Sequence, residues 1–465
     1  MKPSFKPRGI LSGLVVVAGY CTVTGNIYGR DKKETPPNII YILADDLGYG
    51  DLSCYGQKRF TTPNLDKMAG EGMRFMQHYA GSTVSAPSRA SLMTGLHTGH
   101  CPIRGNREVQ PEGQMPLPAN IPTVAGLLQT AGYNTACIGK WGLGYPGSEG
   151  EPNKKGFDYF FGYNCQREAH HYYPDHLWRN NQRIEYPSNK KELKQGEFSH
   201  DLFTAEALQF IQKNTTEPFF LYLTYTLPHA DMDVPEDSMK EFIGLYDEKP
   251  FGGGGYIKQD NPAAAFAGML KRLDGDVGRI LELLKTLGID KNTLVIFTSD
   301  NGPHSEGGHR PDYFNSSGGL RGIKRDMYEG GIRVPFIAWW PGTVKSGTES
   351  RHISAFWDFM PTACELAKVS PPKNTDGISY LSTLKGQTQK NHKYLYWELY
   401  EGAEKQALLK PPYKLVRIRD NAQSDYRYEL YNLEEDITES KNISESIPKI
   451  TTKMKSEIEK IRIPL

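Results

Sequence analysis

The feature that most constrains the fold is a run of apolar, β-branched and aromatic residues that recurs along the chain and ends each time in a turn with polar side chains. Such runs occupy residues 38–44, 133–138, 219–225 and 294–299. Runs that are apolar throughout are typical of strands buried on both faces of a largely parallel sheet. Helical patterns lie between them, at residues 63–72, 123–131, 200–214 and 263–287. The alternation predicts an α/β domain.

The pattern changes near residue 371. Short strand-like segments at 394–398, 414–417 and 428–432 are separated by turn residues, and a helical segment follows at 447–461. This order predicts a smaller antiparallel sheet with the last helix packed on it. We therefore expect a main α/β domain at residues 36–370 and a C-terminal α+β subdomain at 371–465.

The first 25 residues have the pattern of a signal peptide. Lys2, Lys6 and Arg8 precede an apolar run at 10–18, which is too short to cross a bilayer. Lipid attachment at Cys21 is the less favoured alternative, because a bulky Tyr20 precedes it. We expect an exported protein, periplasmic or on the cell surface, without a membrane span.

Charge and cysteine content exclude several classes of partner. The 55 Lys and Arg residues balance 54 Asp and Glu residues, with no basic block, so nucleic acid is not expected. The cysteines after Cys21 are scattered, without the paired spacing of a zinc site. Buried thiols and a small-molecule partner are the expectation, and the sequence makes no prediction of oligomeric state.

Oxygen-bearing side chains follow two of the predicted strands. Asp45 and Asp46 end the first, and Asp300 and Asn301 end the fourth. The carboxyl ends of parallel strands meet at one edge, where α/β proteins bind ligands. Oxygen ligands without clustered His or Cys indicate Ca²⁺ or Mg²⁺ rather than zinc. For either pair alone, two solvated turn carboxylates would be the simpler interpretation.

A set of cationic side chains could neutralise a tetrahedral oxyanion at the same edge; it comprises Arg89, Lys140, His229 and Lys324. Ser85 precedes Pro87 by two residues and Arg89 by four. This spacing predicts that Ser85 lies just before a helix, where free N–H groups favour an anion, with Arg89 on the same face. An ordinary capped helix start is the alternative.

Residues 85–95 read SAPSRASLMTG, which resembles the signature of the formylglycine-dependent sulfatases, whose first residue is Cys or Ser. The resemblance extends to DDLG at 45–48, GKW at 139–141, PH at 228–229, SDNG at 299–302 and LEED at 433–436. It implies a serine-type bacterial carbohydrate sulfatase. The implied fold is alkaline-phosphatase-like, a large mixed sheet flanked by helices, with a smaller C-terminal domain of antiparallel sheet plus helix.

The resemblance also implies roles for site residues. Ser85 would be oxidised by a sulfatase-maturating enzyme to formylglycine, whose hydrate attacks sulfur and later expels sulfate, which a plain serine cannot do. The modified residue would share Ca²⁺ with Asp45, Asp46, Asp300 and Asn301. The cationic set would act on the anion: Arg89 would stabilise the hydrate, Lys140 and Lys324 would bind sulfate, and His229 would bind sulfate and protonate the leaving alcohol.

One departure from the family pattern concerns the base. Family members commonly read KWHLG where residues 140–144 read KWGLG, so the histidine credited with removing the hydrate proton is replaced by Gly142. His304, just beyond Asp300, is the candidate replacement. A substrate-binding or surface position for His304 is the alternative.

The loop at 167–178 gathers histidines and aromatic residues suited to a sugar ring, and we expect His170, His171 and Trp178 to bind substrate. The resulting hypothesis is an exo-acting sulfatase of sulfated glycans, with galactose or N-acetylgalactosamine sulfate as the leading sugar. A phosphate or phosphonate monoester hydrolase of the same superfamily is one alternative. A non-catalytic glycan-binding protein, suggested by the missing histidine, is the other.

Overall fold

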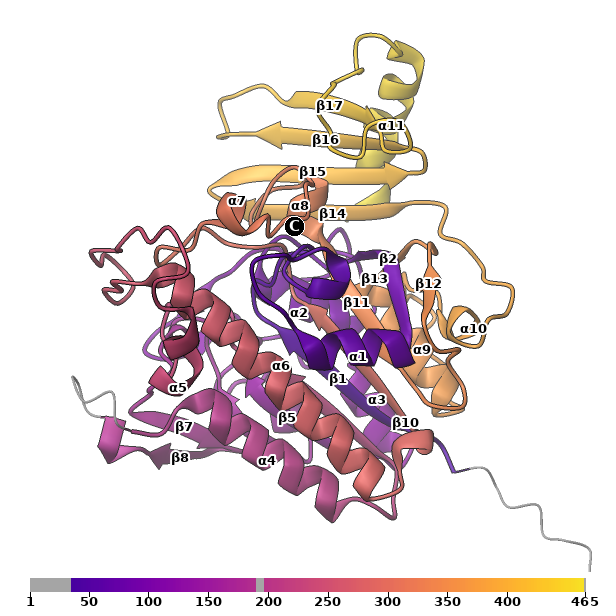
Figure 1. Ribbon diagram of the computed structural model, residues 1–465. Helices are drawn as coiled ribbons and strands as arrows, with labels where there is room; N and C mark the ends of the chain where they lie inside the picture. Colours follow the sequence, from indigo (N-terminus) through magenta and orange to yellow (C-terminus); the bar gives the residue numbers. More distant parts are fainter. Residues whose placement is uncertain (1–34, 190–195, 464–465) are drawn as a thin grey trace, which may run out of the picture. The chain divides into compact units, whose positions relative to one another are not determined.

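An 11-stranded mixed sheet forms the centre of the computed structural model, which describes residues 35–189 and 196–463 (Figure 1). The signal peptide expected at residues 1–25 lies outside these residues. In spatial order the sheet is β12-β2-β11-β10-β1-β9-β5-β6-β7-β8, with β13 beside β2. The strands are β1 (Asn38–Ala44), β2 (Met73–Tyr79), β5 (Asn134–Lys140), β6 (Tyr159–Tyr163), β7 (His176–Arg179), β8 (Gln182–Glu185), β9 (Phe219–Thr224), β10 (Thr293–Ser299), β11 (Arg333–Trp339), β12 (Thr348–Ser350) and β13 (Ser354–Ala355).

The middle of this sheet is parallel, as the apolar runs predict. Strands β10, β1, β9, β5 and β6 run in one direction, and β11 and β7 join them antiparallel on either side. The four predicted strands are β1, β5, β9 and β10, with ends that agree to within about two residues. In register, Ala44 pairs with Ser299. The residues that follow these two strands therefore emerge side by side.

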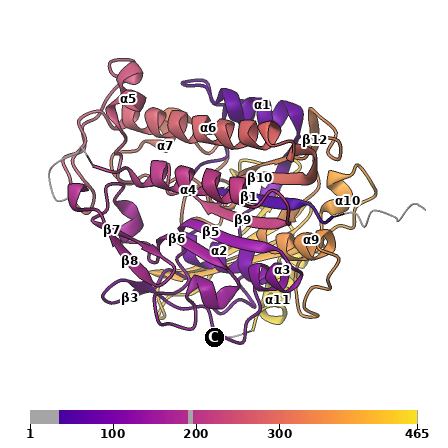
Figure 2. The same cartoon turned by 90° about the horizontal axis from the view of Figure 1, so that it is seen from below.

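Helices cover both faces of the sheet (Figure 2). Alternate residues of β1 point to opposite faces: Ile40 packs with α1, α4 and α6, and Tyr41 packs with α2, α3 and α9. The α/β prediction is thus confirmed. The helices are α1 (Pro63–Glu71), α2 (Ser85–Thr94), α3 (Val124–Thr130), α4 (Ser199–Lys213), α5 (Glu236–Met239), α6 (Pro262–Thr286), α7 (Pro311–Phe314), α8 (Glu329–Ile332), α9 (Phe359–Leu366) and α10 (Leu381–Leu384).

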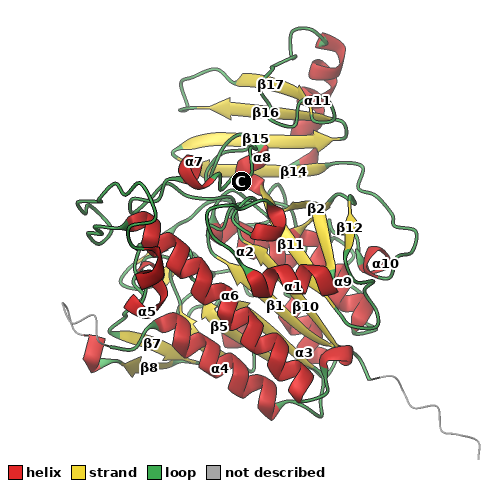
Figure 3. Ribbon diagram, viewed as in Figure 1, coloured by secondary structure: helices red, strands yellow, loops and turns green. Residues whose placement is uncertain are grey.

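A four-stranded antiparallel sheet and the last helix make up the C-terminal part, as expected (Figure 3). Its elements are β14 (Leu395–Glu401), β15 (Ala403–Lys410), β16 (Tyr413–Arg419), β17 (Arg427–Asn432) and α11 (Pro448–Ile461). Met454 and Ile458 of α11 pack on one face of this sheet. On the other face, the Trp397 indole N–H donates to the carbonyl of Ala80, which follows β2. The small sheet is therefore joined to the central one through a buried contact. A minor two-stranded ribbon, β3 (Glu108–Val109) with β4 (Gly113–Gln114), completes the strands.

The described cysteines carry free thiols, namely Cys54, Cys101, Cys137, Cys165 and Cys364, and all but Cys54 are buried. Within residues 35–189 and 196–463, every helix is too short or too polar to cross a membrane.

Candidate active site

The site lies where the carboxyl ends of β1, β5 and β10 meet. Asp45 and Asp46 follow β1, and Asp300 follows β10, so the register of the two strands brings these carboxylates together. The Asp46 backbone N–H donates to Asp300 Oδ1 over 3.1 Å. Asp46 has a left-handed backbone, with φ of 63°, which turns the chain sharply at this point. All three carboxylates are buried.

Ser85 is the first residue of α2, one position further into the helix than the sequence predicts. Its side chain is buried against two of the carboxylates: Oγ lies 3.0 Å from Asp45 Oδ1 and 2.5 Å from Asp300 Oδ2. Arg89, one turn later, reaches the same carboxylate through Nε and Nη2, at 3.2 and 3.0 Å from Asp300 Oδ2. The predicted shared face of Ser85 and Arg89 is therefore present.

Lys140, the last residue of β5, completes the surroundings of Ser85. Its ammonium group donates to Asp45 Oδ2 over 2.6 Å and to Ser85 Oγ over 3.1 Å. Its carbonyl accepts a hydrogen bond of 2.9 Å from Arg89. Ser85 thus lies between buried carboxylates and buried cations.

Burial and charge act in opposite directions on the ionisation of these groups. Burial raises the pKa of Asp45, but the charges of Lys140 and Arg89 outweigh it and hold this pKa well below its usual value. Burial and the neighbouring Asp45 charge raise the pKa of Asp300 to about 7. Burial also lowers the pKa of Lys140, against the opposing effect of Asp45. A further positive charge beside Asp300 would therefore favour its ionised form.

A second group of contacts surrounds Lys324. Its ammonium donates to Asp46 Oδ2 at 2.9 Å, to His229 Nε2 at 3.0 Å and to Glu306 Oε2 at 2.9 Å. Burial lowers the pKa of Lys324, but the carboxylates of Asp46 and Glu306 outweigh it and raise this pKa overall. Asp46 connects this group to the one around Ser85.

The hydrogen bonds of His229 define its protonation. Nδ1 lies 2.5 Å from the Ala230 carbonyl and acts as donor, so Nε2 is the acceptor for Lys324. Burial and the Lys324 charge hold the pKa of His229 well below its usual value. This shift favours the neutral ring, so an acid role would need a proton from a neighbour, and the Lys324 ammonium is in contact with Nε2.

The oxygen donors fit a hard divalent cation. One carboxylate oxygen from each of Asp45, Asp46 and Asp300 lies within 4.8 Å of the others. Asn301 donates through its amide nitrogen to Asp46 Oδ1 at 2.6 Å, while its buried Oδ1 has no hydrogen-bond partner within residues 35–189 and 196–463. A buried oxygen without a donor beside three carboxylates matches the ligand preference of Ca²⁺ and Mg²⁺.

The structure does not support His304 as the replacement base. Its ring is buried beside His229, but both nitrogens are engaged by backbone groups: Nε2 donates to the Pro228 carbonyl at 3.1 Å, and Nδ1 accepts from the Glu306 N–H at 3.0 Å. Neither nitrogen is free to accept a proton or to bind a sugar. Closeness to Asp300 in the sequence thus brings His304 beside His229, and its role as a base stays a prediction.

The three predicted sugar-binding residues lie in different surroundings. His170 stacks on His229, with centroids 4.4 Å apart, and so borders the site. His171 pairs with Asp231 at 2.9 Å and is half-exposed. Trp178 lies on β7, where its indole N–H donates to Glu112 at 2.7 Å. Only His170 is brought into contact with the residues around Lys324.

Glu306 and Arg325 border the site without having been predicted. Glu306 Oε1 accepts from Arg325 at 2.8 Å, and the side chains are 20% and 44% exposed. Arg325 also donates to Glu401 of β14 at 3.2 Å, which links this border to the small sheet. The only sequence feature that pointed to Arg325 as a site residue was its position next to Lys324. Glu306 lies in an irregular segment, and no sequence pattern pointed to it.

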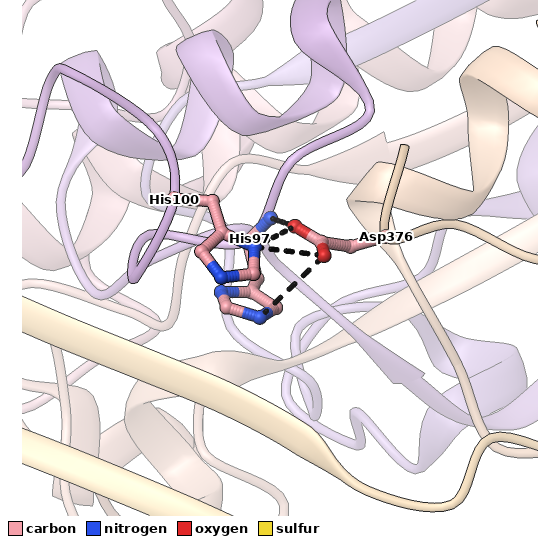
Figure 4. Close-up of side chains that lie close together, drawn as sticks. All are labelled: His97, His100 and Asp376. Carbon is pink, nitrogen blue, oxygen red and sulfur yellow. Dashed lines mark hydrogen bonds and ion pairs between the residues drawn. The ribbon is translucent and has the colours of Figure 1, made fainter. Parts of the chain in front are cut away.

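A second cluster of metal-type side chains, His97, His100 and Asp376, lies after the end of α2 (Figure 4). The Gly99 N–H donates to His97 Nδ1 at 3.1 Å, which leaves the ring proton on Nε2, 3.7 Å from Asp376. His100 Nδ1 lies 2.9 Å from the same carboxylate. In this tautomer His97 offers no lone pair from Nε2 to a metal. In this cluster, hydrogen bonds of Asp376 with His97 and His100 hold the segment before α10 against the residues that follow α2.

Comparison with known proteins decides the family. The sulfatase family model matches residues 37–369, most of the chain, and the model described as "N-sulphoglucosamine sulphohydrolase, C-terminal" matches residues 322–463. The chain belongs to the sulfatase family. As a sulfatase it is classed among the sulfuric ester hydrolases, in agreement with the resemblance noted in the sequence.

Relatives with assigned names share a large part of this sulfatase. N-acetylgalactosamine-6-sulfatase of Mus musculus is 36% identical over 374 residues, which cover 76% of this chain and 67% of the relative. Arylsulfatase G of Rattus norvegicus is 32% identical over 431 residues, covering 83% and 75%. The alignment with the mouse protein thus spans about two thirds of that relative's length.

Solved structures agree with the sulfatase fold. The crystal structure of Ps i-CgsB in complex with k-i-k-neocarrahexaose has a TM-score of 0.76 and 28% identity, and the match covers 92% of both chains. The expected alkaline-phosphatase-like architecture of a large mixed sheet with a smaller C-terminal sheet is confirmed.

Proposed function

We propose that this sulfatase removes sulfate esters from glycans, acting at chain ends, with a nucleophile made from Ser85. The observation that carries the proposal is the position of Ser85 Oγ, within 3.1 Å of Asp45, Asp300 and Lys140 together. A hydroxyl held by carboxylates and an ammonium at a helix start is placed to be modified and to meet an anion.

The chain's own residues supply most of the charge stabilisation. Lys140 and Lys324 are buried, and their ammonium groups now donate hydrogen bonds to carboxylates. When sulfate binds, its oxygens would accept these hydrogen bonds instead. Arg89 holds Asp300 and the Lys140 carbonyl in place. Lys324 also donates to His229 Nε2, so that a proton passed along this contact would reach the leaving alcohol from His229.

Asp45, Asp46, Asp300 and Asn301 would hold Ca²⁺ in this proposal. When bound, the ion would lower the free energy of the negative charge that develops on the nucleophile and on the sulfate group. Three buried carboxylates already face three buried cations, Arg89, Lys140 and Lys324. A bound divalent cation would make the net charge of this group of side chains positive, which favours the binding of a negatively charged sulfate ester.

The proposed modification is the oxidation of Ser85 to formylglycine by a sulfatase-maturating enzyme. The hydrated aldehyde would attack sulfur, the alcohol would leave with a proton, and loss of the remaining hydroxyl proton would expel sulfate and restore the aldehyde. Gly142 supplies no side chain for that last proton, and both ring nitrogens of His304 are engaged by backbone groups. No described residue is assigned as this base.

The proposed substrates are galactose and N-acetylgalactosamine sulfates. They are supported by a relative named for N-acetylgalactosamine 6-sulfate and by a structural neighbour in complex with a neocarrahexaose. His170, stacked on His229 at the border of the site, is the residue best placed to meet the sugar. His171 and Trp178 have other contacts, and we propose no role for them.

A panel of defined monosulfated sugars tests the proposal. The protein is co-expressed with a maturating enzyme, and released sulfate is measured for each sugar beside an aryl sulfate and the matching aryl phosphate. We expect sulfate release from a galactose or N-acetylgalactosamine sulfate. Faster cleavage of the aryl phosphate would favour the phosphate or phosphonate hydrolase, and sugar binding without any release would favour the glycan-binding protein.

Location in the cell is part of the proposal. The charged and apolar segment at residues 1–25 supports export to the periplasm or the cell surface, with lipid attachment at Cys21 as the less favoured form. Fractionation of the source cells, followed by N-terminal sequencing of the mature protein, checks both points.

A further inference from the structure

The loop after β6 lies beside the catalytic end of β5. Hydrogen bonding continues past the ends of these two strands: the Trp141 N–H donates to the Tyr163 carbonyl at 2.9 Å, and the Gly142 N–H donates to the Asn164 carbonyl at 3.1 Å. Because Gly142 follows Lys140 by two residues, this pairing holds the loop at the same sheet edge as the Lys140 ammonium. Gln166 belongs to this loop.

The Gln166 amide fills the space that a side chain at position 142 would occupy. A Cβ on Gly142 would lie 2.4 Å from Gln166 Nε2 and 3.9 Å from Arg89 Cδ. Gly142 also has a left-handed backbone, with φ of 73°. The space beside Gly142 and Arg89 is therefore occupied by the side chain of Gln166, which follows β6, and not by a side chain at the end of β5.

Among the residues that the structure describes, the amide nitrogen of Gln166 has no hydrogen-bond acceptor. Gln166 is 7% exposed, and its Nε2 is a buried donor without a hydrogen-bond partner among the described residues. Buried donors are nearly always hydrogen-bonded, so an orphan donor beside Gly142, on the same side as the Arg89 side chain, needs a reason. An oxygen of a bound anion would satisfy it.

We propose that Gln166 is a further anion-binding residue of this site, with its Nε2 hydrogen donated to an oxygen of the sulfate group. This inference rests on the proposed function for the identity of the anion. A neutral amide adds a donor without changing the charge of the site. Because it has no lone pair that accepts a proton near neutral pH, Gln166 binds sulfate and does not replace the missing base.

Affinity for inorganic sulfate, measured by calorimetry, tests the proposal without turnover. The protein is purified with Ser85 unconverted, and Gln166→Met is compared with wild type, because methionine keeps the length of the side chain and removes the donor. We expect the affinity for sulfate to fall about 10- to 100-fold, the range for a hydrogen bond to a charged partner. Gln166→Glu should weaken it further, because its carboxylate repels the anion.

Two comparisons separate anion binding from a structural effect. Gln209→Met, an exposed site on α4, should leave sulfate affinity unchanged. Gly142→Ala, which keeps Gln166 but places a methyl group 2.4 Å from its amide nitrogen, should weaken sulfate binding as Gln166→Met does. Unchanged affinity in folded Gln166→Met and Gln166→Glu would overturn the proposal.

The converted enzyme gives a second readout that distinguishes this inference from the proposed function. In an active preparation, Gln166→Met should raise KM for the sulfated sugar and the inhibition constant of free sulfate in parallel. If wild type released no sulfate from any sugar, the proposed function would fail, while the calorimetric comparison would still decide the role of Gln166.

Discussion

Lys140 Nζ lies 2.6 Å from Asp45 Oδ2, and both side chains are buried. Replacing the lysine would leave a buried carboxylate without its cation and would remove a donor for the sulfate group. We expect Lys140→Ala to lower kcat/KM about 100- to 1,000-fold, the usual effect of losing one donor to a developing negative charge. The measurement is sulfate release by converted protein, with the half-exposed Lys271→Ala as the control. Activity close to wild type would contradict this role.

Removal of divalent cations should abolish activity reversibly. Asp45, Asp46 and Asp300 repel one another when ionised, and the buried Asn301 Oδ1 lacks a donor in the described part of the chain, so a cation is expected to bind there. Chelation followed by titration with Ca²⁺ or Mg²⁺ checks this expectation. Full activity after exhaustive chelation, with no metal found by elemental analysis, would rule out the metal assignment.

Glu306 places a carboxylate 2.9 Å from the Lys324 ammonium, which is a proposed sulfate ligand. An anion bound at Lys324 must share this cation with Glu306 and is repelled by it. Glu306→Gln keeps the shape and removes the charge, so we expect inhibition by inorganic sulfate to strengthen roughly 3- to 10-fold. Glu401→Gln, at the other carboxylate bound to Arg325, is the matched control. Weaker or unchanged inhibition in Glu306→Gln would show that the carboxylate does not compete with the anion.

Asp51 makes stability depend on pH. Burial raises its pKa to about 7, and none of the described residues forms a hydrogen bond with Oδ1. Because the folded state holds this proton more tightly than the unfolded state, the stabilising contribution is complete below about pH 4 and is lost as pH rises through about 7. Asp51→Asn should therefore gain stability over wild type between pH 5 and pH 8.

The melting temperatures of Asp51→Asn and wild type at pH 5 and pH 8 check the sign of this effect. Asp260→Asn, whose side chain is 69% exposed, serves as control. A difference between Asp51→Asn and wild type that stays constant across this range would show that Asp51 does not titrate there.

The parallel core and the main site were predictable because they depend on local pattern. An apolar run that ends in Asp45 or Asp300 indicates a buried strand, and parallel strands end at the same edge of a sheet. That β1 and β10 are neighbours within this sheet comes only from the structure. The small sheet was recognisable for the same reason. Strand β15 was missed, because charged residues interrupt its first half, and the hairpin β7–β8 was missed because β8 is mostly exposed.

The positions of the remaining site residues depend on tertiary contacts that no sequence pattern predicts. Gln166 reaches Gly142 only because pairing of β5 with β6 continues beyond the strands. Glu306 meets Lys324 across an irregular segment. His304 shows the opposite case: its position next to Asp300 in the sequence suggested a role in proton transfer, but backbone groups occupy both ring nitrogens. Ring orientation and hydrogen-bond partners follow from tertiary structure, which the sequence pattern does not encode.

The 2.5 Å contact between Ser85 and Asp300 is the centre of the proposed mechanism. The most direct test is the mass spectrum of the peptide that contains Ser85, taken from a preparation of measured sulfatase activity. The proposed mechanism predicts that Ser85 has lost two hydrogen atoms, as in formylglycine, in a fraction of molecules that rises in proportion to activity. A fully active preparation in which Ser85 is entirely unmodified serine would contradict it.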